Sequence, residues 1–152
     1  MKKASAAGIN GLILPDVPFE EKDEFSVYAS KYGIDFISMI APTSASRITK
    51  IAKEAQGFIY CVSSLGVTGT RSHITTDIDS MIDLVRAASN VPCAIGFGIS
   101  NCNQAKEMAK KSDGAIVGSA IVKLIAEYGR DCVEPVTRFV REMKKAVMRA
   151  EE

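Results

Sequence analysis

The stretch "PCAIGFGISNCNQAKEMAKKSDGAIVGSAIVKLI", residues 92–125, contains two short apolar runs, each followed by a segment with helical spacing of apolar residues. The first run breaks at Gly96 and Gly98, and the second breaks at Gly118 and Ser119. Continuous apolar runs of about four to eight residues are typical of strands that are covered on both faces of a parallel sheet. The stretch therefore predicts two successive strand–helix units.

The same unit recurs along the whole chain. Apolar runs predict strands within residues 9–15, 35–42, 57–64, 92–98 and 113–119. Apolar residues at three- and four-residue spacing predict helices at 20–32, 45–55, 79–88, 103–110, 119–127 and 133–150. No linker or low-complexity segment divides the chain, so we expect one α/β domain over residues 1–152 with five parallel β/α units.

The pattern alone is compatible with two architectures. One is an open, doubly wound five-stranded sheet of the flavodoxin type. The other is part of an eight-stranded barrel, whose usual length of about 250 residues exceeds the 152 residues of this chain. In both architectures ligands bind at the carboxyl ends of the strands, so the position of the site is predicted before the architecture is settled.

Composition excludes several classes of protein. A net charge of +1 and no apolar run of about 20 residues give no basis for a nucleic-acid or membrane partner, and the expected location is the cytoplasm. Cys61, Cys93, Cys102 and Cys132 are too widely spaced for a zinc or disulfide framework, and His73 lies alone in a polar stretch. The sequence therefore predicts neither a metal nor a bound cofactor.

Glycine, serine and threonine dominate where the predicted strands end. A glycine lets the backbone approach an anion closely, and a helix that starts directly after it points free N–H groups and its positive dipole end at that anion. Two such loops, at 96–100 and 117–119, follow successive strands. The pattern favours a phosphate-binding site over two unrelated tight turns.

Five segments carry a resemblance to a known family: "GINGLILPDVPFEE" at 8–21, "FISMIAPTS" at 36–44, "GFIYCVSSLGVTGTRS" at 57–72, "GFGIS" at 96–100 and "GAIVGSAIVKLI" at 114–125. The sequence closely resembles the tryptophan synthase alpha chain family, and "GVTG" at 66–69 together with "GFGIS" and "GSAIVK" is highly specific for it. The resemblance implies a partial TIM (β/α)8 barrel that contains strands four to eight. It further implies a lyase of tryptophan biosynthesis, which cleaves indole-3-glycerol phosphate to indole and glyceraldehyde 3-phosphate and passes indole to a beta chain.

The resemblance also assigns roles to individual residues. Phosphate-binding positions of the family correspond to Gly69, Gly98, Gly118 and Ser119. Residues that line the substrate pocket or belong to the mobile lid correspond to Tyr60, Thr68 and Phe97. A loop that faces the beta chain corresponds to Asp16 and Pro18, although an aspartate at this place in the sequence is equally typical of a helix cap.

The resemblance implies that the family's catalytic glutamate and aspartate belong to strands that precede residue 1. Cleavage needs two positioned acid–base groups, and Asp16 is the one carboxylate that ends a predicted strand. We therefore expect no indole release from the 152-residue chain alone. Alternatives are another phosphate-binding barrel enzyme of amino-acid biosynthesis, or a module that binds phosphate esters or the beta chain without turnover. Five strands leave two open edges, so a homodimer through those edges is a further expectation.

Overall fold

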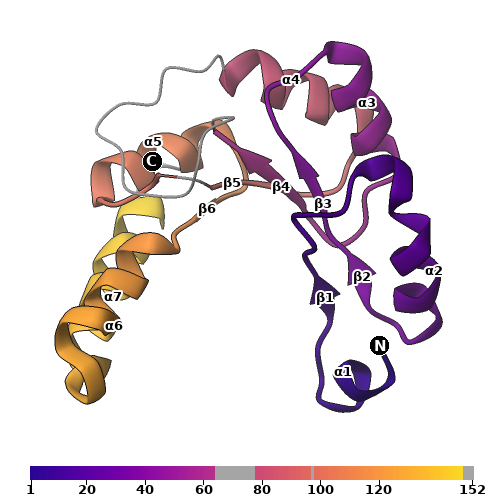
Figure 1. Cartoon of the computed structure of the whole chain (residues 1–152). Coiled ribbons are helices and arrows are strands. Elements are labelled where there is room, and N and C mark those ends of the chain that lie inside the picture. Colours follow the sequence, from indigo (N-terminus) through magenta and orange to yellow (C-terminus); the bar gives the residue numbers. More distant parts are fainter. Residues whose placement is uncertain (64–77, 97, 149–152) are drawn as a thin grey trace.

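The computed structural model describes residues 1–63, 78–96 and 98–148. Each predicted strand region contains at least one short strand, and every pairing is parallel. In chain order the strands are β1 (Gly11–Leu12), β2 (Asp35–Phe36), β3 (Ser38–Ile40), β4 (Ile59–Val62), β5 (Cys93–Gly96) and β6 (Gly114–Ile116) (Figure 1). The prediction of five parallel β/α units is confirmed.

The helices follow the predicted ranges closely. They are α1 (Lys2–Ala6), α2 (Asp23–Lys31), α3 (Ala45–Lys53), α4 (Ile78–Ala88), α5 (Cys102–Lys111), α6 (Ser119–Tyr128) and α7 (Val133–Met148), with short 3-10 turns η1 (Phe19–Glu21) and η2 (Gly129–Asp131). The sequence did not predict α1, because its five residues bury nothing and show no apolar periodicity. Among the described residues, no helix combines the length and the hydropathy that a bilayer-spanning segment needs.

Strand order decides between the two architectures. The larger sheet has the order β3-β4-β5-β6, and the smaller sheet pairs β1 with β2. Strands that are neighbours in the chain are thus neighbours in space throughout the described residues. A doubly wound sheet reverses its order at a switch point, whereas a barrel keeps chain order around its wall. The fold is therefore a partial barrel.

The second predicted strand, at 35–42, is divided into β2 and β3 at Ile37. Gly11 pairs with Asp35 on one side of this segment, and Ser38 pairs with Ile59 on the other side. The Ile37 N–H donates to the carbonyl oxygen of Leu12 at 2.9 Å, so the pairing with β1 extends to Ile37. The pairing with β4 begins at the next residue, Ser38. One extended segment thus joins the two sheets.

The helix-facing side of the β3–β6 sheet forms the core. Ile40, Ile59, Cys61 and Ile95 are fully buried and belong to one apolar cluster with residues of α3, α4 and α5. In Figure 1 these three helices lie along one side of the sheet. Alternation along a strand then places the intervening residues on the opposite, inward side.

The inward side carries an aligned row of side chains. Met39 pairs with Tyr60, Tyr60 with Ala94, and Ala94 with Gly114. All four residues are partly exposed, in contrast to the core on the other face. The side chains of this row become smaller from β3 and β4 to β5 and β6. Space is therefore left on the inward side of the last two strands.

Candidate functional site

The two glycine loops meet at one edge of the sheet. Gly96 on β5 pairs with Ile116 on β6. Gly98 and Gly118 each lie two residues beyond this pair, so the parallel register brings both loops to the carboxyl ends of adjacent strands. This is the edge at which α/β proteins of either architecture bind ligands.

The loop after β5 has a fixed backbone. Gly98 has a φ of +81°, a left-handed conformation that favours glycine. Asn101 caps α5, because its Oδ1 accepts a hydrogen bond from the N–H of Gln104 at 3.0 Å. The Gln104 Oε1 in turn accepts from the N–H of Ser100 at 2.9 Å and from its hydroxyl at 3.1 Å. Side chains of the loop thus satisfy the start of α5.

The start of α6 is built differently. Its N-cap residue is Gly118, which has no side chain to accept from the first amides of the helix. Gly118 and Ser119 are both exposed, and the Gly118 carbonyl accepts the N–H groups of Ile121 and Val122 at 2.9 and 3.1 Å. The amides and the positive dipole end of this ten-residue helix are therefore directed toward solvent beside the β5 loop. An anion is the complementary ligand.

Tyr60 forms the adjoining wall of the inward side. A Cβ placed on Gly96 would lie 2.7 Å from Cζ of Tyr60 and closer still to its hydroxyl oxygen. The phenol therefore occupies the space that any other residue at position 96 would need. Burial raises the pKa of Tyr60 above its usual value, so the hydroxyl stays neutral at pH 7 and can donate a hydrogen bond.

Sequence reasoning missed Gly96 and Met39 as members of this wall. The sequence pattern places Gly96 in a loop, whereas it is the last residue of β5 and is buried. Met39 lies beside Tyr60 through strand register. Alternation along β4 predicts that Val62, two residues after Tyr60, shares its inward face. Which residues of the neighbouring strands lie beside Tyr60 depends on the register between strands, which is a tertiary property.

Three residues assigned from the resemblance lie outside the described residues. These are Thr68 and Gly69 of the segment that the resemblance identifies as a lid, and Phe97 between the two glycines of the β5 loop. The described part of the site therefore consists of Tyr60, Gly98, Gly118 and Ser119.

Asp16 and Pro18 lie exposed in the segment between β1 and η1. Pro18 is the N-cap residue of η1 and no side chain caps it, so Asp16 does not have the alternative role of a helix cap. Glu20 lies in η1, directly after this segment, and its carboxylate accepts two hydrogen bonds from the Arg47 guanidinium of α3 at 2.6 and 3.1 Å. These hydrogen bonds lower the pKa of Glu20 from its usual value.

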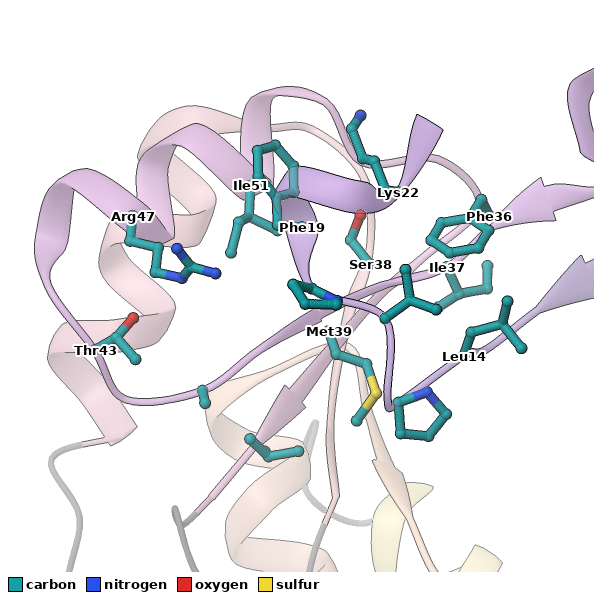
Figure 2. Close-up of a pocket in the computed structure, with 15 residues that line it drawn as sticks. Leu14, Phe19, Lys22, Phe36, Ile37, Ser38, Met39, Thr43, Arg47 and Ile51 are labelled. Atoms are coloured by element: carbon teal, nitrogen blue, oxygen red, sulfur yellow. The ribbon is translucent and has the colours of Figure 1, made fainter. Parts of the chain in front are cut away.

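A cavity of about 280 Å³ lies beneath this segment (Figure 2). Leu14, Phe19, Met39 and Ile51 contribute apolar walls, and Figure 2 shows Arg47 directed toward it from α3. Lys22, a further lining residue, is 2.7 Å from Glu54. The cations of the cavity are thus already paired, and the cavity lies by β1 and β3 rather than at the glycine loops of β5 and β6.

The remaining candidate groups have structural partners. Asp113 opens β6 and its Oδ2 accepts from the N–H of Cys93 at 2.8 Å, at the amino ends of the strands. Asp79 in α4 pairs with Lys111 at 2.7 Å. The Cys61 thiol contacts Cys93, and this contact together with burial raises the pKa of Cys61, which keeps the thiol protonated. In the part of the chain that the structure describes, no group of His, Cys, Asp and Glu side chains could hold a metal ion.

Comparison with known proteins agrees with this architecture. The family model described as "Tryptophan synthase alpha chain" matches residues 1–148. The tryptophan synthase alpha chain of Lacticaseibacillus casei is 44% identical over 147 residues, which are 97% of this chain and 55% of that one. The chain thus spans about half the length of the curated relatives that it matches.

Solved structures give the same result. The tryptophan synthase subunit alpha of Campylobacter jejuni superposes with a TM-score of 0.79 at 36% identity, and the match covers 93% of this chain and 56% of that one. A structure of the tryptophan synthase a2b2 complex from Pyrococcus furiosus gives a TM-score of 0.81 at 29% identity, over 94% of this chain and 58% of that one. On the evidence of fold, strand order and sequence identity together, this chain belongs to the tryptophan synthase alpha chain family.

Proposed function

We propose that the protein to which this chain contributes cleaves indole-3-glycerol phosphate to indole and glyceraldehyde 3-phosphate in tryptophan biosynthesis. The main support is the match of residues 1–148 to the family model. This match favours the proposal over the alternative of another family of phosphate-binding barrels. In this proposal the chain supplies strands four to eight of the barrel as one domain. The acid–base groups of the reaction belong to the part of the family fold that this chain does not match.

The chain's own residues supply the phosphate-binding side of the site. The open amides at the start of α6, beginning at Gly118 and Ser119, bind the phosphate of the substrate together with the backbone near Gly98 and Gly69. Hydrogen bonds to a charged partner contribute about 1.5 to 3 kcal/mol each, so two or three amides suffice for an affinity between about millimolar and micromolar. No lysine or arginine is needed for this contact.

Binding the phosphate orients the reacting end of the substrate. In the cleavage, a base removes the proton of the glycerol hydroxyl, the electrons form the aldehyde carbonyl, and the carbon–carbon bond to the indole ring breaks. That bond breaks readily once the ring carbon carries a proton, since its electrons then return to the ring. Tyr60 and Phe97 line the pocket, and Thr68 belongs to the lid that closes over it.

The proposed protein partner is a tryptophan synthase beta chain. The solved Pyrococcus furiosus relative is described as part of an a2b2 complex. In this chain the exposed Asp16 and Pro18 are the proposed contact, and the Arg47–Glu20 pair holds their segment in place. We also propose a cytoplasmic location, supported by the four cysteines, none of which forms a disulfide.

A chimera tests the activity. Residues 1–148 of this chain replace the matched region of the Lacticaseibacillus casei alpha chain, and indole release from indole-3-glycerol phosphate is measured. We expect turnover, and we expect Ser119→Asp to raise KM at least tenfold because its carboxylate repels the phosphate. Ala87→Asp on the outer surface of α4 is the matched control. A folded chimera that binds the substrate but releases no indole contradicts the proposal.

Binding is measured separately on the chain itself. Glycerol 3-phosphate is titrated into the isotope-labelled chain, and amide shifts are followed at Gly98, Gly118 and Ser119. We expect saturable shifts at these residues and none at Ala87. Equal, unsaturated shifts at all four positions would indicate a general ionic effect and no phosphate site.

A further inference from the structure

Helices α2 and α3 are neighbours on the outer side of the strands, but they do not pack closely on each other (Figure 1). Helix α3 packs on α4, whereas α2 packs on β2. Two ion pairs bridge the gap between α2 and α3. One joins Glu20, directly before α2, to Arg47 at 2.6 Å, and the other joins Lys22 to Glu54 at 2.7 Å. Charged side chains thus connect the two helices at the surface.

Two cavities adjoin in this gap. The first is the cavity of about 280 Å³ with apolar walls (Figure 2). The second has a volume of about 300 Å³, and its lining includes the polar residues Ser26, Ser30, Glu54 and Gln56. Three residues line both cavities, namely Lys22, Phe36 and Ser38. We call the two together the double cavity. An apolar space beside a polar one is complementary to a small molecule that is apolar at one end and polar at the other.

Ser38 places a buried hydroxyl where the two cavities meet. Its neighbour Met39 belongs to the inward row, so alternation along β3 directs Ser38 toward the helices. Ser38 is only 9% exposed, and its hydroxyl has no hydrogen-bond partner among the described residues. In Figure 2 the hydroxyl oxygen lies on the side of Lys22. Buried polar groups in proteins are nearly always hydrogen-bonded, so this hydroxyl indicates a partner that enters the double cavity.

The ion pair at the rim of the double cavity offers both signs of charge. The Lys22 ammonium lies 5.0 Å from the centre of the Phe19 ring, which lines the apolar cavity. Its partner Glu54 has a side chain that is 48% exposed. An ion pair between partly exposed groups contributes little to stability, so Lys22 and Glu54 can exchange their mutual contact for contacts with a ligand. A ligand that carries a carboxylate and an ammonium on one carbon is complementary to this pair.

We propose that the double cavity binds an aromatic α-amino acid. The ring occupies the apolar cavity, the carboxylate accepts from the Lys22 ammonium and the Ser38 hydroxyl, and the ammonium donates to Glu54. The size is suitable, because an engineered protein cavity of about 150 Å³ holds benzene, and the apolar cavity here has about 280 Å³. All lining residues of the double cavity lie within residues 14–62, apart from the glycine loops of β5 and β6. The inference does not rest on the proposed function.

Titration with L-phenylalanine tests this inference. The amino acid is added to the isotope-labelled chain, and backbone amide shifts are followed. We expect saturable shifts at Lys22 and Ser38 and none at Gly118 and Ser119. L-Alanine, which lacks the ring, and 3-phenylpropionate, which lacks the ammonium, should each bind about tenfold more weakly or worse, because each loses one of the proposed contacts.

Variants identify the contacts. Ser38→Ala should weaken binding of L-phenylalanine about tenfold and leave the urea midpoint unchanged, because the hydroxyl bonds to the ligand and to no described residue. Glu54→Gln should weaken binding of L-phenylalanine but not that of 3-phenylpropionate, since only the amino acid carries an ammonium. Asp79→Asn is the matched control, because it removes an ion pair with Lys111 of the same 2.7 Å length outside the double cavity.

Several outcomes would overturn the inference. Absence of saturable shifts with L-phenylalanine means that the double cavity holds water only. Equal binding of L-phenylalanine and 3-phenylpropionate, or equal weakening of both by Glu54→Gln, means that no zwitterion is recognised. Shifts confined to Gly118 and Ser119 assign the ligand to the phosphate-binding loops. Binding is read without turnover, so these results are independent of indole release by the chimera.

Discussion

The phenol of Tyr60 on β4 occupies the position that a side chain at Gly96 on β5 would take. The contact fills the inward space beside Gly96, and it brings a residue that the resemblance assigns to the substrate pocket against a glycine that the sequence pattern places in a loop.

Gly96→Ala should destabilise the chain by about 1 to 3 kcal/mol, because the new Cβ overlaps the Tyr60 ring and forces it to move. Urea unfolding measures the change. The cost should largely disappear in a Tyr60→Ala background, since the overlapping ring is then absent. Gly114→Ala is the control, because a Cβ there meets only the Ala94 Cβ at 3.7 Å. Equal costs in both backgrounds would contradict the contact.

Gly98→Ala and Gly118→Ala should differ in their effect on stability. Gly98 has a φ of +81°, and a side chain in this conformation costs about 1 to 2 kcal/mol. Gly118 has a negative φ and open space around a built Cβ, so its replacement should change stability by less than about 0.5 kcal/mol. Thermal unfolding of the two variants side by side checks this order, and the reverse order would contradict it.

Asn101→Ala should cost about 1 kcal/mol through loss of the α5 cap. Asn101→Asp should retain most of the stability, because its carboxylate also accepts the Gln104 N–H. Hydrogen exchange at Gln104 reports the cap directly, and it should accelerate in the alanine variant only. Unchanged exchange in Asn101→Ala would show that the cap does not protect this amide.

The Glu20–Arg47 pair should make stability depend on pH. Arg47 lowers the pKa of Glu20 from its usual value of 4.5, so the pair stabilises the fold above that pH, and the contribution is lost as pH falls through the lowered value. The difference in urea midpoint between the parent and Arg47→Met should therefore be present at neutral pH and vanish in strong acid. Arg86→Met, which removes a longer ion pair with Asp113 at 3.9 Å, is the matched control. A constant difference across the range would contradict the assignment.

Tyr60 should ionise at a higher pH than an ordinary tyrosine, because burial raises its pKa. The neutral phenol is the form that the fold favours, so this contribution is present below the ordinary pKa of about 10 and is lost as pH rises through the higher folded value. Ultraviolet titration of the parent minus Tyr60→Phe isolates this phenol. A difference curve centred at or below the ordinary tyrosine value would contradict the burial argument.

Local sequence was sufficient to predict the repeating elements. Within the described residues, apolar runs and helical spacing located every strand region and the six longer helices, because burial on a sheet face or a helix stripe is imposed by side chains near in sequence. The glycines of residues 96–100 and 117–119 likewise marked the loops of the candidate site, since a positive φ or a capless helix start is a local property. Helix α1 was not predicted, because it buries no residue.

Relations between distant residues required the tertiary structure. Strand order depends on which edges pair, so periodicity alone left a doubly wound sheet open, and within the sequence only the family resemblance pointed to the partial barrel. The division of the second strand at Ile37 arises because β1 and β4 pair with different parts of one segment. The contact of Tyr60 with Gly96 likewise depends on the register between β4 and β5. Local periodicity determined the elements of this protein, and long-range pairing decided how they meet.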